Sequence, residues 1–116
     1  MESVGLTFLY SPVRELGPTV AFYRDVLDWV EAWSEGDETV AFQVPGSSIQ
    51  VMVSIDHYSE RPGPMYRVPD LDAFLAARPE LVVIMPPRGI PGGRVVSVSD
   101  GGGNSLYFFE YDESAG

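Results

Sequence analysis

Apolar positions along the chain change from strand-like spacing to helical spacing soon after the N-terminus. Residues 5–10 are apolar and rich in β-forming types, which predicts a strand. From residue 16 the apolar positions follow a 3.6-residue period, which predicts an amphipathic helix over 16–27. Pro18 suits the first turn of that helix, where a missing N–H costs nothing. The apolar stripe of the helix consists of Leu16, Val20, Tyr23 and Leu27.

Three further segments in the first half have the pattern of strands. Residues 29–33 form one, and residues 39–44 alternate so that every second side chain shares a face. Residues 49–54 form the third, after turns at Glu35-Gly36-Asp37 and at Pro45-Gly46. The first half is therefore expected to run strand, helix, then three strands.

The second half repeats this order of elements. A short strand is expected at 65–68, followed by a helix at 71–78 with Asp70 as its N-cap. Strands at 81–85, 94–99 and 105–111 follow. The Pro- and Gly-rich segment 86–93, which carries Arg88, is expected to be a loop, and Asp100-Gly-Gly-Gly-Asn104 a hairpin turn.

Local sequence similarity supports an internal repeat. Val13-Arg-Glu-Leu16 returns as Val68-Pro-Asp-Leu71, 55 residues later. The same offset pairs Val40 with Val95, whereas the final strands are offset by 57 residues and pair Gln50 with Tyr107 and Met52 with Phe109. One domain over 1–116 is expected, with a first module at about 4–55, a linker at about 56–63 and a second module at about 64–112.

Composition limits the possible partners. A formal charge of −10 argues against a nucleic-acid surface, which needs clustered cations, and suits either a cationic partner or simple solubility. The chain has no cysteine, no apolar run long enough to span a bilayer and no signal peptide pattern. We therefore expect an acidic, cytoplasmic protein that interacts with neither membrane nor nucleic acid.

The order and spacing of three short motifs resemble the vicinal oxygen chelate superfamily. These motifs are Phe22-Tyr-Arg-Asp-Val-Leu27, the Val68–Leu71 entry into the second helix, and Asp100–Asn104, where Gly101 stands at a position usually held by proline. The superfamily includes glyoxalase I, extradiol dioxygenases, and the fosfomycin and bleomycin resistance proteins. The resemblance implies an α+β fold in which two βαβββ modules form a curved mixed sheet, the glyoxalase/bleomycin-resistance-like fold.

The resemblance also implies four positions for metal ligands, at the first and last strands of each module. In this chain these positions hold Phe8, Gly63 (Pro64 if the count is off by one), Gln50 and Tyr107. Only Gln50 offers a plausible side-chain ligand, and the single histidine rules out a two-histidine site within one chain. Neither a metal nor another cofactor is expected.

In the superfamily, the strands of each module curl into half of a barrel-like cup. Strand alternation adds further positions that face inward, which predicts a cup lined by aromatic, methionine and amide side chains. Such a lining suits a planar aromatic or a cationic small molecule, and the alternative is that the same side chains fill the cup as a second core. The predicted ligand-binding residues are Phe8, Tyr10, Trp33, Gln50, Met52, Met65, Arg67, Tyr107 and Phe109.

Three function classes remain open. The first is a metal-independent protein of the bleomycin-resistance type that binds an antibiotic or a metabolite, which the resemblance implies to be a homodimer. The second is a lyase or isomerase with a degenerate or unconventional site, using Tyr107 or His57 as acid or base. The third is a non-catalytic dimeric interaction module whose cup is packed shut. His57 and Arg88 are also compatible with ordinary solvated surface positions.

Overall fold

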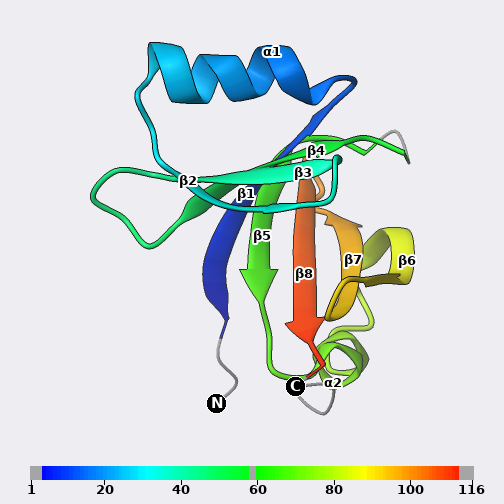
Figure 1. Ribbon diagram of the computed structural model, residues 1–116. Helices are drawn as coiled ribbons and strands as arrows, with labels where there is room; N and C mark the ends of the chain where they lie inside the picture. The colour runs from blue at the N-terminus through cyan, green and yellow to red at the C-terminus, as the bar shows by residue number, and fades with distance from the viewer. Residues whose placement is uncertain (1–3, 58–59, 113–116) are drawn as a thin grey trace. The chain divides into compact units, whose positions relative to one another are not determined.

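A computed structural model describes residues 4–57 and 60–112, which form two compact units (Figure 1). The N-terminal unit is Thr7–Pro62, and the C-terminal unit comprises residues 63–112 together with residues 4–6. Tyr58 and Ser59 of the expected linker lie outside the described residues. Within the described segments, no helix combines the length and the apolar character needed to cross a membrane.

The N-terminal unit has the predicted strand–helix–three-strand order. Its sheet runs β2-β3-β4-β1, with β1 parallel to β4 and the other neighbours antiparallel. The elements are β1 (Gly5–Val13), α1 (Leu16–Ala21), the π-helical turn η1 (Phe22–Val26), β2 (Glu31–Glu35), β3 (Thr39–Gln43) and β4 (Gln50–Ile55).

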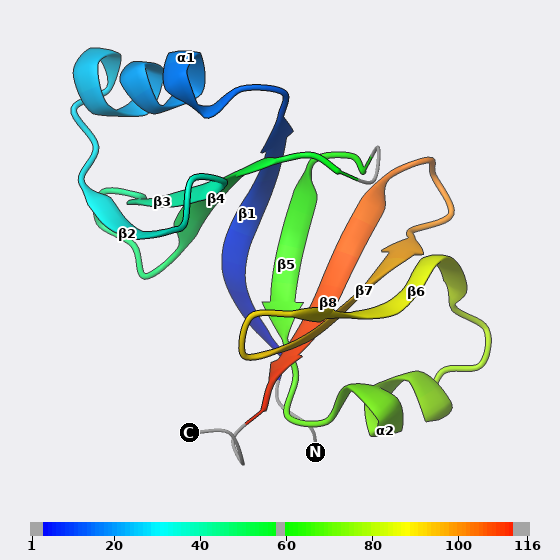
Figure 2. The same ribbon diagram turned by 45° about the vertical axis from the view of Figure 1, so that its right-hand side comes forward.

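The C-terminal unit repeats this topology. Its sheet runs β6-β7-β8-β5, with β5 parallel to β8 (Figure 2). The elements are β5 (Gly63–Arg67), α2 (Leu71–Ala76), β6 (Val82–Ile90), β7 (Gly93–Ser99) and β8 (Ser105–Tyr111). The predicted α+β class and the doubled βαβββ arrangement are confirmed.

In the N-terminal unit α1 and η1 cover one face of the sheet (Figure 1). The helical side chains Leu16, Val20 and Tyr23, part of the predicted stripe, pack against a buried cluster from β3 and β4. The ring of Tyr23 stacks on Phe42 at 5.2 Å between centroids. The cluster consists of Val40, Phe42, Val51 and Val53. The hydrophobic stripe thus determined which face of the helix meets the sheet.

In the C-terminal unit α2 covers one face of the sheet through two fully buried residues, Leu71 and Phe74. Phe74 contacts Phe108 with ring centroids 4.4 Å apart. Asp70 accepts a hydrogen bond from the Ala73 N–H at 3.1 Å, so the predicted N-cap is confirmed. Val68, Val96 and Val98 complete this core.

The segment predicted as a loop at 86–93 is instead mostly strand. β6 continues through Pro86 and Pro87, and Arg88 pairs with Val95 of β7. Within its unit β6 pairs only with β7, and proline is tolerated on such a strand because one side of its backbone needs no ladder hydrogen bonds. Register shifts between Val83 and Arg88 absorb the irregularity.

Strand register also corrects two pairings expected from the repeat. Phe8 lies opposite Gln50, and Met65 lies opposite Tyr107, so the counterpart of Phe8 is Met65 rather than Gly63. Val95 lies opposite Phe109, and Ala41 lies opposite Met52, which makes Ala41 the counterpart of Val95. The first strands are therefore offset by 57 residues although the helices keep an offset of 55, because β1 and β5 connect differently to their helices.

Candidate functional site

Each sheet has one face that its own helix does not cover, which we call the helix-free face. In the N-terminal unit, register places Phe8, Gln50 and Gln43 in one row across β1, β4 and β3. The next row on the same face contains Tyr10, Met52, Ala41 and Trp33. The five residues predicted here as ligand-binding therefore share one face: Phe8, Tyr10, Trp33, Gln50 and Met52.

A hydrogen-bonded aromatic cluster organises this face. The Trp33 indole Nε1–H donates to Gln50 Oε1 at 2.8 Å, and Phe8 meets the Trp33 ring edge-on at 5.9 Å between centroids. Gln50 Nε2 donates in turn to Gln43 Oε1 at 3.4 Å. The carbonyl end of Gln50 is thus directed at the indole, and its side chain is held in one orientation.

Gln43 supports this cluster and was not predicted. Its Nε2 donates to backbone carbonyls of the following turn, to Ile49 at 3.1 Å and to Ser47 at short range. The amide therefore fixes the β3–β4 turn and presents its oxygen to Gln50. The only signal in the sequence is a polar residue at the end of an alternating strand, which does not identify its partners.

Exposure differs within this face. Phe8 is 6% exposed, whereas Tyr10, Trp33, Gln50 and Met52 are half-buried. A half-buried wall of aromatic, amide and thioether groups offers stacking surface together with a few oriented polar atoms.

The helix-free face of the C-terminal unit holds the remaining predicted residues. Met65, Tyr107, Ser97 and Met85 form one row across β5, β8, β7 and β6. The next row is Arg67, Phe109, Val95 and Arg88. This face is closed at its centre, because Met65, Tyr107 and Phe109 are 5%, 1% and 1% exposed. The filled-core alternative therefore describes its centre better than an open cup does.

Two arginines lie at the margins of this closed face. The exposed Arg67 places its guanidinium carbon 4.6 Å from the centroid of the Tyr111 ring, a cation–π contact. Arg88, half-buried on β6, directs Nη1 to the Met85 sulfur at 3.0 Å. Sequence reasoning placed Arg88 in a loop, whereas the strand register brings it onto the same face as Arg67.

Ser97 is an unpredicted polar residue in the centre of this face. It is 2% exposed, and its hydroxyl has no hydrogen-bond partner within the described residues. An unsatisfied buried hydroxyl costs about 1–3 kcal/mol of stability, so an apolar residue would be expected there on packing grounds. The signal in the sequence is a serine interrupting the valine-rich run Val95-Val-Ser-Val98.

The residues present do not fit the divalent metal that the resemblance implies. Phe8 has no donor atom, and a Cβ built on Gly63 would lie 2.2 Å from the Ser105 carbonyl oxygen, so no ligand side chain fits there. Met65, the true counterpart of Phe8, offers only a soft thioether. Over residues 4–57 and 60–112, no three His, Asp or Glu side chains converge as a metal site.

His57 lies apart from the Trp33–Gln50 cluster. Gln50 begins β4, whereas His57 follows the other end of that strand and bonds Glu38 Oε1 through Nε2 at 3.0 Å. Both side chains are more than half exposed. This position matches a solvated surface histidine, and its proposed role as a base stays a prediction.

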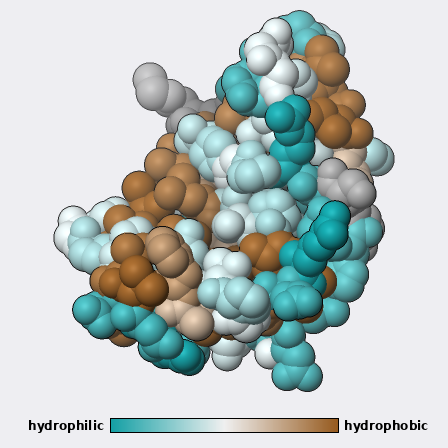
Figure 3. All heavy atoms as spheres, turned by 90° about the horizontal axis from the view of Figure 1, so that it is seen from above, coloured by the Kyte–Doolittle hydropathy of each residue, from teal (hydrophilic) through white to brown (hydrophobic). Residues whose placement is uncertain are grey.

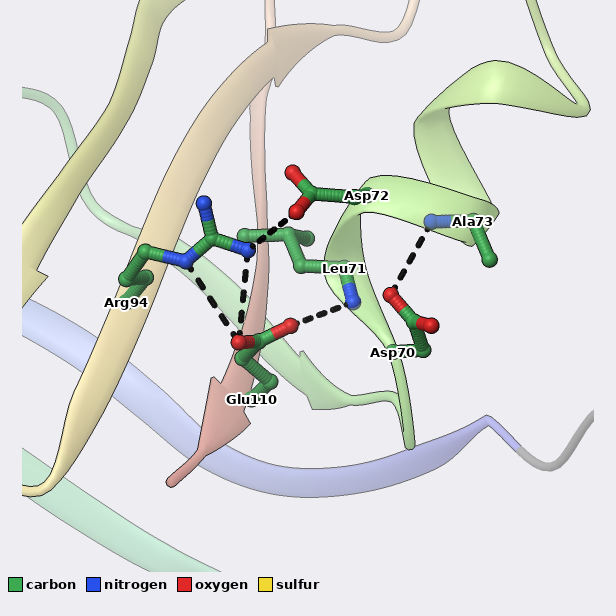
Figure 4. Close-up of polar contacts among 6 residues, drawn as sticks. All are labelled: Asp70, Leu71, Asp72, Ala73, Arg94 and Glu110. Atoms are coloured by element: carbon green, nitrogen blue, oxygen red, sulfur yellow. Dashed lines mark hydrogen bonds and ion pairs between the residues drawn. The ribbon is translucent and has the colours of Figure 1, made fainter. Parts of the chain in front are cut away.

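A polar cluster on the helix side of the C-terminal sheet has a structural role (Figure 4). Glu110 Oε1 accepts from the Leu71 N–H at 2.5 Å, and Glu110 Oε2 lies 3.3 Å from Arg94 Nη2. Arg94 Nη2 also pairs with Asp72 at 3.0 Å. The hydrogen bond to Asp72 is the main cause that raises the pKa of Arg94, and the negative charge of Glu110 raises it further. The cluster connects β7 and β8 to the start of α2.

Comparison with known proteins identifies the fold. No family model matches the chain, and neither does any curated protein sequence. Among solved structures, methylmalonyl-CoA epimerase from Mycobacterium tuberculosis is 23% identical with a TM-score of 0.69, covering 96% of this chain and 90% of its own.

Two further structures agree with this result. A glyoxalase/bleomycin resistance protein/dioxygenase superfamily member from Vibrio splendidus has a TM-score of 0.64 at 13% identity, covering 97% of this chain and 100% of its own. A Streptomyces coelicolor methylmalonyl-CoA epimerase has a TM-score of 0.72 at 15% identity, covering 94% and 99%. At these identities the likeness concerns the fold, which is the glyoxalase/bleomycin-resistance-like fold.

Proposed function

We propose that the chain is a metal-independent small-molecule binding protein of the bleomycin-resistance type. The observation that carries the proposal is the half-buried wall on the N-terminal helix-free face, where Trp33 and Gln50 are fixed by their mutual hydrogen bond. A preorganised indole and amide bind a planar organic ligand with little loss of side-chain entropy. A ligand stacks on Trp33 and is oriented by the neighbouring amides, while Tyr10 and Met52 add apolar contact.

The residues at the ligand positions support independence from metal. Gly63→His tests it directly, because the new side chain meets the Ser105 carbonyl and we expect lower stability without gain of metal affinity. Zinc and manganese titrations monitored by calorimetry provide the measurement, with the unsubstituted protein as reference. Stoichiometric metal in the purified protein would contradict this part of the proposal.

The two tryptophans of the chain supply a matched test of the binding face. Trp33 lies on the helix-free face, whereas Trp29 packs against the core on the helix side, with its ring 5.4 Å from that of Tyr23. A planar probe such as 1-naphthamide should quench the fluorescence of Trp29→Phe, in which Trp33 remains, and leave that of Trp33→Phe almost unchanged. Equal quenching of the two variants would overturn the proposal. Quenching that does not saturate with probe concentration in either variant would overturn it as well.

An isomerase is the second candidate, favoured by the recurrence of methylmalonyl-CoA epimerases among the structural neighbours. Tyr107 or His57 would supply the acid or base, and of these Tyr107 is only 1% exposed. Proton exchange at the α-carbon of methylmalonyl-CoA, followed by NMR in D₂O with and without added divalent metal, tests the activity. Exchange that is lost in Tyr107→Phe would favour this candidate over simple binding.

A dimeric interaction role is the third candidate, and a cytoplasmic homodimer is the assembly we expect. Apolar side chains reach the surface in several patches, seen as brown areas in Figure 3. In the N-terminal unit, Phe22, Val26 and Val30 are 47%, 67% and 72% exposed. Light scattering of Phe22→Ser against the unsubstituted protein tests the assembly, since loss of a dimer would assign this surface to self-association.

A further inference from the structure

Two glutamine amides on the N-terminal helix-free face have orientations that their partners fix. An indole N–H can only donate, and that of Trp33 contacts Gln50 Oε1 at 2.8 Å, so the carbonyl end of this amide faces the indole. Backbone carbonyls can only accept, and those of Ser47 and Ile49 both contact Gln43 Nε2. Gln43 Oε1 is therefore the end that receives Gln50 Nε2, at 3.4 Å. Reversing either amide would break these bonds.

The same bonds leave a defined hydrogen-bonding capacity on the two amides. Among the described residues, Gln50 Nε2 uses one of its two hydrogens. The Oε1 atoms of Gln50 and Gln43 each accept one bond, and an amide oxygen can accept two. Both side chains are half-buried, so a ligand can meet them at the surface without entering the interior of the protein. The pair therefore offers a ligand one donor and two acceptors.

The two rows that hold these amides consist of uncharged side chains. Their members are Phe8, Gln50 and Gln43 in one row, and Tyr10, Met52, Ala41 and Trp33 in the next. The row beyond contributes Glu35, an exposed residue on β2. In a chain of net charge −10, these two rows are a neutral area. A charged group placed against them would lose water without gaining an ion pair, which is unfavourable.

We propose that this face selects a neutral planar ring that carries an N–H beside a carbonyl, as in a lactam or an imide. The ring lies against Trp33, its carbonyl accepts from Gln50 Nε2, and its N–H donates to a glutamine oxygen. A ligand with only acceptors leaves these oxygens unmatched, and a ligand with only donors leaves the Gln50 N–H unmatched. The inference rests on the function proposed above, narrows its ligand class and disfavours a cationic ligand.

Four bicyclic probes of similar size separate the contributions of hydrogen bonding and charge. Each is titrated into ¹⁵N-labelled protein, with the Trp33 indole N–H and the Gln50 side-chain NH₂ as reporters and the Trp29 indole as internal reference. The lactam 2-quinolone should shift both reporters saturably. Coumarin, in which a ring oxygen replaces the N–H, should bind about ten-fold more weakly because one hydrogen bond is lost. The cation N-methylquinolinium and the anion 2-naphthoate should also bind more weakly than 2-quinolone.

Gln50→Glu tests the amide itself. The carboxylate still accepts from Trp33 but has no N–H for the ligand carbonyl, so the affinity for 2-quinolone should fall about ten-fold. The affinity for N-methylquinolinium should rise, because a negative charge now lies on the face. Arg24→Gln is the control, since it changes the net charge by the same amount at an exposed residue that pairs with Asp25. It should leave both affinities unchanged.

The outcomes separate this inference from the function on which it rests. Equal affinities for 2-quinolone and coumarin would overturn the lactam selectivity, although saturable shifts of the Trp33 indole would still support a planar ligand on this face. Tighter binding of either charged probe than of 2-quinolone would overturn the neutral class. An unchanged 2-quinolone affinity in Gln50→Glu, or an equal loss in Arg24→Gln, would remove Gln50 from the site. If no probe shifts the Trp33 indole, the proposed function fails as well.

Discussion

The two units share one topology and hold their helices by different means. In the N-terminal unit neither α1 nor η1 contains a fully buried residue, and Glu15 at the N-cap position makes no side-chain cap bond. In the C-terminal unit α2 buries Leu71 and Phe74, is capped by Asp70, and donates the Leu71 N–H to Glu110.

One topology can therefore be stabilised by different kinds of interaction. An apolar stripe with aromatic stacking holds α1 together with η1, which continues the helical segment to Val26. This combined segment needs few polar bonds because its contact surface is spread over more residues than that of α2. The six residues of α2 present little surface, and a helix that short is unstable in isolation. Specific bonds at its first turn compensate for the small contact area.

The largest expected difference concerns the aromatic anchors of the two helices. Phe74→Ala should lower the free energy of unfolding by about 3–5 kcal/mol, because a residue that is 3% exposed leaves a cavity against Phe108. Tyr23→Ala should cost about 2–3 kcal/mol, since Tyr23 is only half-buried. Urea unfolding measures both. A larger loss for Tyr23→Ala would contradict the contrast between the helices.

Glu110 tests the polar attachment of α2. Glu110→Ala should cost about 2–3 kcal/mol, because the partly buried Leu71 N–H loses its acceptor and Arg94 loses one of its two carboxylate partners. Glu110→Gln should cost less, since its amide oxygen can still accept from Leu71. Thermal unfolding provides the measurement. Asp25→Ala, which breaks an exposed pair, serves as control and should leave stability almost unchanged.

The two N-cap positions should respond differently to alanine. Asp70→Ala removes the bond to the Ala73 N–H and should cost about 1 kcal/mol. Glu15→Ala removes no side-chain cap bond and should be close to neutral. Hydrogen exchange of the first-turn amides would locate the effect. Equal costs at the two positions would show that the caps do not distinguish the helices.

The smallest effect concerns the turn between β7 and β8. The Asn104 side-chain amide, followed by the Gly102 and Asn104 backbone N–H groups, lowers the pKa of Asp100. Because the pKa is lowered in the folded state, the turn's contribution to stability is present above the unfolded pKa of about 3.9 and is lost as pH falls through the folded value. NMR titration of the Asp100 carboxyl should show a higher pKa in Asn104→Ala, and an unchanged value would remove Asn104 as the cause.

Local patterns predicted most of the elements because their causes lie within a few residues. The apolar stripe of α1, the Asp70 cap and the Asp100–Asn104 turn depend on neighbouring side chains and backbone. The candidate site likewise combines features with local causes and features that depend on distant partners. Strand alternation placed Phe8 and Tyr10 on one face, and the register with Gln50 and Met52 agrees, since side chains alternate with a period of two.

Features that depend on partners distant in the sequence were missed or misplaced. Pro86-Pro87 reads as a loop, and only pairing along β7 makes it part of β6. Gly63 reads as the counterpart of Phe8, whereas the β5–β8 register assigns that position to Met65. The cap supplied to α2 by Glu110 comes from 39 residues away.

In this protein, local sequence patterns sufficed to predict the order of the elements, the doubled βαβββ arrangement and the faces of the regularly alternating strand residues. Tertiary structure alone decided register, burial and charge placement. It closed the centre of the C-terminal helix-free face over Tyr107 and Phe109 and brought Arg88 onto that face. It also left the Ser97 hydroxyl without a hydrogen-bond partner among the residues that the structure describes. The reason is physical: periodicity is a local property of the backbone, whereas register and burial depend on which distant strands meet.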